Sequence, residues 1–237
     1  MTDDRATLSD QATPADQAAA AGGAAEPGSH EFEVVSSETV YSGAILALRL
    51  DQVSMPGGRV VEREVIEHHG AVAVAAIDHD DNVVLINQYR HPIGARLLEL
   101  PAGLLDLPDE DPLLAAQREL AEETGLAARE WSVLVDVVLS PGFTDEALRV
   151  YLARDLFETE RPEPELEEAD LEVVRMPVDA AVRAALAGEI VNATAVAGVL
   201  ALAAARAGGA QLRPPDVPWP GQPTALLRRQ AERKSED

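Results

Sequence analysis

The stretch from Gly103 to Leu126, GLLDLPDEDPLLAAQRELAEETGL, constrains this chain more than any other feature. Asp111 stands where a helix N-cap belongs, and Pro112 follows at the first helical position, where its missing N–H costs no hydrogen bond. Gly125 stands where a left-handed glycine would end the helix. The stretch therefore predicts a loop, a helix with a sharp start, and a glycine stop.

Three glutamates of this helix share one face, because residues three and four positions apart are neighbours on a helix. They are Glu119, Glu122 and Glu123, and Arg118 precedes the first of them. Like charges at this spacing repel one another. The group is therefore either a solvated acidic face or a site for a hard cation such as Mg²⁺, which takes oxygen ligands and contacts phosphate oxygens.

The spacing resembles the Nudix box, which reads glycine, five residues, glutamate, seven residues, then Arg-Glu-aliphatic-any-Glu-Glu-any-Gly-aliphatic. The second half matches in full from Arg118 to Leu126, and seven residues separate Glu110 from Arg118. The chain departs from the pattern once, since six residues lie between Gly103 and Glu110. This insertion falls in the loop before the helix and leaves the glutamates in register.

Composition narrows the function. Apolar residues make up 46% of the 237 residues, enough for a substantial core, and no apolar run is long enough for a transmembrane helix. The formal net charge of −23 argues against a nucleic-acid partner, which needs a basic surface. A small anionic substrate remains compatible, because bound Mg²⁺ and a few arginines reverse the local field. With no cysteine and no signal-peptide pattern, we expect a cytoplasmic protein without a membrane partner.

Short apolar runs separated by turn residues predict strands before and after the box, with two further helices toward the C-terminal end. Together with the resemblance, they predict an α/β protein: a Nudix-type α/β/α sandwich with a mixed sheet, preceded by a small antiparallel N-terminal β unit. The predicted segments are a disordered tail at 1–30, a dimerising N-terminal β unit at 31–66, a Nudix hydrolase domain at 67–207, and a Pro-rich, charged C-terminal tail at 208–237.

Four stretches outside the box resemble the ADP-ribose pyrophosphatase subgroup, and the richness in Ala, Arg and Asp suggests its actinobacterial form. Pro141 lies sixteen residues after Gly125, and Arg63-Glu64 resembles an arginine–glutamate pair of the subgroup. The segments 88–92 and 189–192 resemble its sequence before the box and near its C-terminal end. Each feature alone would be an ordinary turn or surface pair, so their joint spacing carries the resemblance.

The resemblance implies a metal site and a general base. Four groups would bind Mg²⁺, or Mn²⁺ as a substitute: the carbonyl of Ala102 and the carboxylates of Glu119, Glu122 and Glu123. The base would come from an acidic loop well past the box. We assign it to Glu168 with Glu167 as the alternative, so that Glu168, Glu167 and Glu123 are the predicted catalytic residues. An acidic loop that serves only as a solvated surface is the competing interpretation.

The substrate would be held by residues on both sides of the box. Arg63 and Arg90 are candidates for phosphate or ribose contacts, since a guanidinium matches phosphate oxygens, although each alone could be a surface arginine on a strand. Glu64 accompanies Arg63, and Leu104 would line the ribose site.

Three functions remain open. The first is Mg²⁺-dependent hydrolysis of ADP-ribose to AMP and ribose 5-phosphate. The second is the same reaction on another nucleoside diphosphate derivative, such as an ADP-sugar, NADH or a diadenosine polyphosphate. The third is a non-catalytic ADP-ribose sensor. The resemblance further implies a homodimer that exchanges its N-terminal strands, because a three-stranded unit is marginally stable alone.

Overall fold

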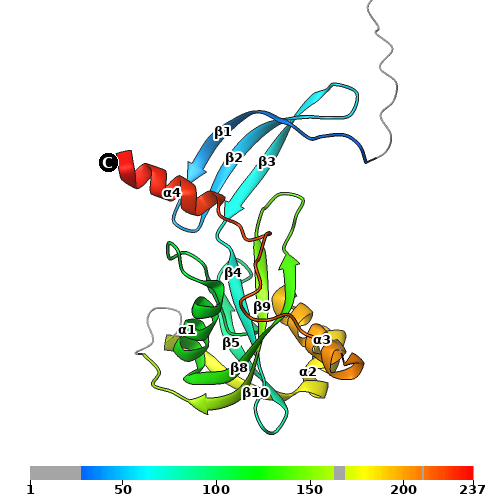
Figure 1. Cartoon of the computed structure of the whole chain (residues 1–237), viewed down its shortest axis with the longest axis vertical. Coiled ribbons are helices and arrows are strands. Elements are labelled where there is room, and N and C mark those ends of the chain that lie inside the picture. Colours follow the sequence, from blue (N-terminus) through cyan, green and yellow to red (C-terminus); the bar gives the residue numbers. More distant parts are fainter. Residues whose placement is uncertain (1–27, 163–168, 210, 237) are drawn as a thin grey trace, which may run out of the picture.

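A computed structural model describes residues 28–162, 169–209 and 211–236 and shows ten strands in three sheets together with four helices (Figure 1). The sheet orders are β1-β2-β3, β7-β4-β9-β8 and β10-β5-β6. In chain order the elements are β1 (Val34–Ser42), β2 (Leu46–Ser54), β3 (Val60–His68), β4 (Ala71–Ala76), β5 (Asn82–Arg90), β6 (Ala95–Glu99), β7 (Ala102–Leu104), α1 (Pro112–Thr124), β8 (Leu126–Val138), β9 (Ala147–Glu158), β10 (Glu172–Pro177), α2 (Val178–Ala187), α3 (Ala193–Gly208) and α4 (Ala225–Glu236).

The main sheet is mixed and is covered by helices on both faces. Strand β4 pairs in parallel with β9 and antiparallel with β7. Its six residues are all buried: Ala71, Ala73 and Ala75 join one hydrophobic cluster with α2 and α3, and the alternate residues join a second cluster with α1. A strand buried on both faces reads as a continuous apolar run. Figure 1 shows α1 on one side of this sheet and α2 and α3 on the other, so the predicted α/β/α sandwich is confirmed.

Helix α1 begins and ends where the local sequence predicts. The Asp111 carboxylate accepts a hydrogen bond from the Leu113 N–H at 2.8 Å, which is the N-cap contact. Gly125 adopts φ 69°, and its N–H donates to the carbonyl of Ala121 at 2.9 Å. Leu120 is fully buried against the sheet, whereas Glu119 and Glu122 are only partly buried.

Helix α3 has 16 residues and packs a small-residue face against the main sheet. Its side chains at Ala195, Val199 and Leu202 are fully buried. Within the described ranges, no helix combines the length and the apolar character needed to cross a membrane.

The N-terminal sheet, β1 to β3, is antiparallel as predicted and projects away from the rest of the fold (Figure 1). Both hydrophobic clusters of the described chain are built from Ala71 onward, so this sheet contributes to neither. Its third strand runs to His68, two residues beyond the predicted end of the β unit at residue 66. Of the N-terminal tail predicted for residues 1–30, residues 1–27 lie outside the described residues.

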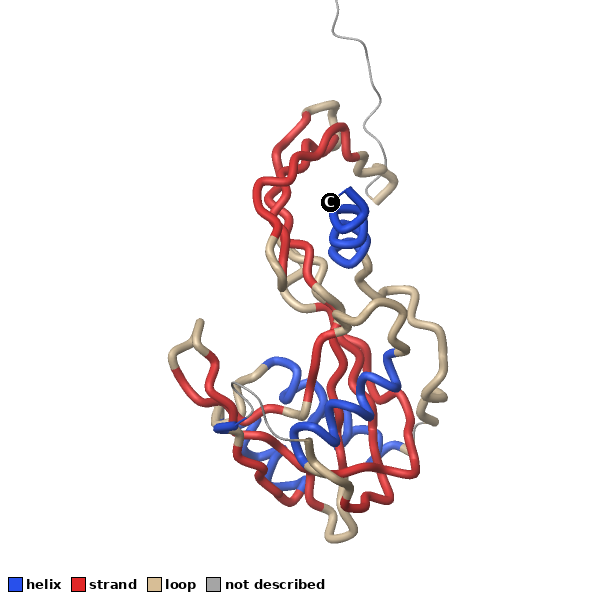
Figure 2. The backbone as a smooth tube through the Cα atoms, turned by 90° about the vertical axis from the view of Figure 1, so that its left-hand side faces the viewer, coloured by secondary structure: helices blue, strands red, loops and turns tan. Residues whose placement is uncertain are grey.

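The C-terminal part is more structured than its proline content indicates. Residues 211–224, here called the C-terminal strap, are extended, and helix α4 follows and lies against the curved N-terminal sheet (Figure 2). Buried Arg149 of β9 donates to the strap carbonyls of Val217 at 2.8 Å and Pro218 at 3.4 Å, and it lies 5.0 Å from the ring centroid of Trp219. The sequence predicted a Pro-rich tail here, but the attachment of the strap depends on a residue more than sixty positions earlier.

Candidate active site

The loop glycine of the box lies against the first glutamate of the helix. Strand β7 pairs with β4, which brings the backbone of Gly103 beside the carboxylate of Glu119. A Cβ added at Gly103 would approach three side-chain atoms of Glu119 more closely than the 3.0 Å that real Cβ atoms respect. Any side chain at this position would therefore have to displace the Glu119 carboxylate.

Arg118 gathers three glutamates around its guanidinium group. Its Nε and Nη2 donate to the two oxygens of Glu110 at 3.0 and 3.1 Å. Its Nη1 donates to Glu119 at 2.7 Å and to Glu122 at 2.9 Å. Hydrogen bonding to Glu110, and the charges of the surrounding carboxylates, hold the pKa of Arg118 above its usual value despite its partial burial. Arg118 thus holds the carboxylates of the three glutamates in place through ion pairs.

Glu123 contacts the first residue of β7, next to the Gly103 that lies against Glu119. Its side chain is 4% exposed, and its Oε2 accepts the Ala102 N–H at 2.9 Å. A nearly buried carboxylate needs such a donor, since burying a charge without a partner is costly. The contact ties α1 to the residue whose carbonyl is the predicted fourth metal ligand; that role of Ala102 stays a prediction.

The donor set fits a hard divalent cation. Four carboxylates from α1 and the preceding loop lie around one end of β7: Glu110, Glu119, Glu122 and Glu123. Carboxylate oxygens are the ligands that Mg²⁺ prefers. Within the described ranges, no three acidic or histidine side chains already form a metal cage. In this structure the Arg118 guanidinium contacts both oxygens of Glu110 and one oxygen each of Glu119 and Glu122.

Arg90 and Leu104 flank this site from the strands. Arg90 closes the β5–β6 hairpin by a two-pronged ion pair with Glu99, at 3.0 and 2.7 Å, and Glu99 is 3% exposed. Leu104 is half-buried at the end of β7. The substrate contacts predicted for Arg90 and Leu104 stay predictions. The structure shows that Arg90 forms an ion pair with the buried carboxylate of Glu99.

Arg63 and Glu64 lie on β3, in the sheet that projects away from the domain carrying α1 (Figure 1). Both are exposed, and Arg63 donates to the carbonyl of Glu62 at 3.3 Å. Within one chain, the structure therefore does not gather them with the glutamates of α1. Their predicted substrate role needs the exchanged dimer that the sequence resemblance implied.

Comparison with known proteins decides the family. The NUDIX domain family matches residues 67–196, which contain α1 and all of its glutamates. The chain belongs to the Nudix family. Residues 32–66 match a second family, the nucleoside diphosphate sugar hydrolase N-terminal domain, over the strands of the N-terminal sheet.

Relatives and a solved structure agree with this Nudix assignment. The chain is 56% identical to an ADP-ribose pyrophosphatase of Mycobacterium tuberculosis over 204 residues, covering 86% of this chain and 99% of that protein. It is 33% identical to an ADP-ribose pyrophosphatase of Bacillus subtilis, covering 70% of this chain and 89% of the relative. A crystal structure of an ADP compounds hydrolase superposes with a TM-score of 0.66 at 23% identity, over 76% of this chain and 96% of the other, which shows the shared fold.

The predicted base residues of this Nudix protein, Glu167 and Glu168, lie outside the described residues. Described residues on both sides of segment 163–168 form hydrogen bonds or ion pairs with other elements. Arg161 Nε donates to the carbonyl of Glu122 at 2.8 Å, next to the C-terminal end of α1, where a cation is favoured. On the far side, Arg96 of β6 forms an ion pair with Asp170 and donates to its carbonyl at 3.2 Å.

These two arginines were missed by sequence reasoning. Arg161 and Glu122 are 39 positions apart, and Arg96 and Asp170 are 74 apart. No helical or strand periodicity links residues at such separations. The one available signal was the general preference of cations for helix C-terminal ends, which does not say which arginine arrives there.

Proposed function

We propose that this Nudix protein hydrolyses the pyrophosphate of ADP-ribose, with Mg²⁺, to AMP and ribose 5-phosphate. The observation that carries the proposal is the carboxylate set of the box, of which Arg118 gathers Glu110, Glu119 and Glu122, with Glu119 against Gly103. The high identity to a protein named ADP-ribose pyrophosphatase, over nearly all of its length, supports the choice of substrate. A non-catalytic sensor is disfavoured, because all three box glutamates are present.

The reaction joins a water oxygen to one phosphorus as the bond from that phosphorus to the bridging oxygen breaks. Bound Mg²⁺ would neutralise the phosphate oxygens and lower the pKa of water. Glu168 accepts the proton that the attacking water releases. Arg118 holds Glu119 and Glu122 in position, and Arg90 and Arg63 bind phosphate or ribose oxygens through their guanidinium groups.

A substrate panel tests this function. The purified protein and Mg²⁺ are offered ADP-ribose, ADP-glucose, NADH and diadenosine polyphosphates, and the products are separated by chromatography. We expect AMP and ribose 5-phosphate from ADP-ribose to form faster than products from the other compounds. A faster rival would move the function to that nucleoside diphosphate derivative, and tight ADP-ribose binding without turnover of any compound would point to a sensor.

The general base can be assigned with two matched variants. We expect Glu168→Gln to lower kcat by about 10²–10⁴-fold, the range typical of a lost general base, while Glu167→Gln stays close to wild type. The pH profile of kcat identifies the role, because loss of the base removes the acidic limb. The opposite order of effects would assign the base to Glu167, and two active variants would place it elsewhere.

We further propose a homodimer in which the N-terminal sheets are exchanged. This sheet exposes large apolar side chains that a solitary surface seldom carries, among them Val35, Val40 and Tyr41, which are 60%, 55% and 57% exposed. We expect light scattering to give a dimer mass, and Val35→Glu to shift it toward the monomer. Leu186→Glu, at an exposed apolar residue of α2, is the control. A wild-type monomer with full activity would contradict the proposal.

A further inference from the structure

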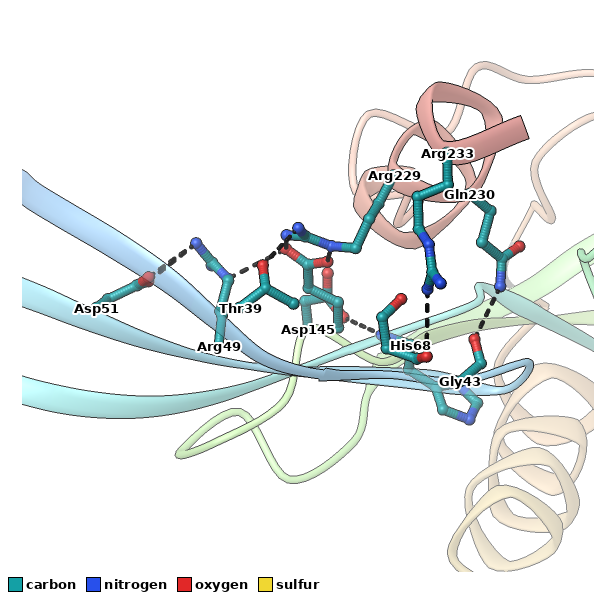
Figure 3. Close-up of polar contacts among 11 residues, drawn as sticks. Thr39, Gly43, Arg49, Asp51, His68, Asp145, Arg229, Gln230 and Arg233 are labelled. Atoms are coloured by element: carbon teal, nitrogen blue, oxygen red, sulfur yellow. Dashed lines mark hydrogen bonds and ion pairs between the residues drawn. The ribbon is translucent and has the colours of Figure 1, made fainter. Parts of the chain in front are cut away.

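We infer that Arg229 of α4 is a positioning residue that fixes the N-terminal sheet, and with it Arg63 and Glu64, on the Nudix domain. The inference rests on the proposed function for the part that concerns substrate. The contacts that carry it join α4, near the C-terminal end of the chain, to strands of the N-terminal sheet, 162 and 190 positions earlier (Figure 3).

Over the residues that the structure describes, the N-terminal sheet is not anchored to the Nudix domain by a shared hydrophobic core. It belongs to neither hydrophobic cluster of the described chain. Its backbone contacts with the domain lie at one end of β3, where the Ile66 N–H donates to the carbonyl of Phe143 at 2.7 Å and the Asp145 N–H donates to the carbonyl of Ile66 at 3.1 Å. The Asp145 carboxylate also accepts the His68 N–H at 2.8 Å. A sheet held at one end keeps freedom to swing about that end.

Helix α4 supplies a second attachment that spans the sheet. Arg229 donates to both oxygens of Glu67 on β3, at 2.7 and 2.8 Å, and to the hydroxyl of Thr39 on β1 at 2.6 Å. Gln230 and Arg233 donate to backbone carbonyls at the β1–β2 turn, of which the Ala44 carbonyl lies 3.0 Å from Gln230. Figure 3 shows these side chains reaching from one face of α4 to the strands.

Arg229 neutralises the negative charge of a carboxylate that is buried in the sheet. Glu67 and Asp51 are 3% and 2% exposed, and both contact Arg49 of β2, at 3.2 and 2.9 Å. Two buried carboxylates with a single guanidinium leave one negative charge uncompensated, and Arg229 supplies the second cation. Its hydrogen bonds, together with the charges of Arg229 and Arg49, lower the pKa of Glu67 against the opposing effect of burial.

The base of α4 is in turn fastened to the Nudix domain. The C-terminal strap is held by Arg149, as described above, and by an ion pair of Arg213 with Asp136 at 2.6 Å. Leu226, in the first turn of α4, is fully buried. The domain, the strap, α4 and β3 therefore form a closed loop of contacts, and two attachments fix an orientation that one leaves free. Arg63 and Glu64 lie four and three residues from Glu67 on the same strand, so they are oriented with it.

The experiment compares Arg229→Met with Arg228→Met in the full chain. Both changes remove one positive charge from α4, but Arg228 is exposed and lies outside this network. We expect Arg229→Met to speed amide hydrogen exchange across β1 and β2 by at least about tenfold, as an undocked element opens more readily. We expect its KM for ADP-ribose to rise about tenfold with kcat nearly unchanged, the pattern of lost binding. Arg228→Met should match wild type in both.

Further variants guard against simple unfolding. Arg229→Lys keeps the charge but loses the two-pronged contact, so it should shift exchange and KM in the same direction by less. Glu67→Gln combined with Arg229→Met should be no worse than Arg229→Met alone, because both remove one interaction. Exchange in Arg229→Met equal to that in Arg228→Met would overturn the inference, as would faster exchange without a change in KM. The exchange measurement needs no substrate, so failure of the proposed function is seen separately, as absence of turnover by wild type.

Discussion

Replacing Glu122 or Glu123 by glutamine is expected to lower kcat for ADP-ribose at least about a hundredfold, since the loss of a metal ligand removes several kcal/mol of charge stabilisation. Glutamine keeps the size of the side chain and removes its charge. At Glu123 the amide oxygen can still accept the Ala102 N–H, so the fold should survive while metal binding weakens. The measurement is kcat at saturating substrate, together with Mn²⁺ binding followed by electron paramagnetic resonance.

Glu130→Gln provides the matched control for these variants. Glu130 is exposed on β8, away from the carboxylate group on α1, and its replacement makes the same change of charge. It should retain wild-type turnover and Mn²⁺ affinity. Near-normal turnover in both Glu122→Gln and Glu123→Gln would refute the metal assignment.

Gly103→Ala is expected to have the next largest effect, because the new methyl group would occupy space now filled by the Glu119 carboxylate. Strand β7 cannot yield easily, since its residues pair with β4 in the main sheet. The change would displace the Glu119 carboxylate without removing it. Its effect should therefore be similar to the loss of a residue that orients a metal ligand, which typically costs about 10–100-fold in metal affinity. We expect Mn²⁺ affinity to fall within that range and kcat at subsaturating metal to fall with it.

Gly208→Ala tests whether a glycine replacement alone has this effect. Gly208 ends α3, and a Cβ there would meet no atom within 4 Å. This variant should bind Mn²⁺ like wild type. Unchanged Mn²⁺ affinity in Gly103→Ala would show that Glu119 has room to move, which would remove the argument for an obligate glycine.

The local sequence predicted the box helix well, because its signals act over a few residues. The N-cap contact of Asp111 and the left-handed Gly125 both depend on neighbours within four positions. The spacing of Glu119, Glu122 and Glu123 placed them on one helical face before any packing was known. The apolar run of β4 is likewise a local signal of a strand, and the structure buries all six of its residues.

In the C-terminal part, local sequence signals did not predict the structure that forms. The sequence predicted a Pro-rich, charged tail, but its charged segment forms α4 and docks on the N-terminal sheet. The charge of Arg229 is the same on a solvated helix as on a docked one. Only the buried Glu67, 162 positions away, distinguishes the two.

The sequence by itself determined the family, the limits of α1 and the alignment of its carboxylates, because helix caps and i, i+3 and i+4 neighbours are local. Only the tertiary structure decided that Gly103 must make room for Glu119, that Arg161 reaches the end of α1, and that α4 fastens the N-terminal sheet. Each of these contacts joins residues from different elements. Chain packing, which depends on the whole set of buried surfaces and charges, brings them together.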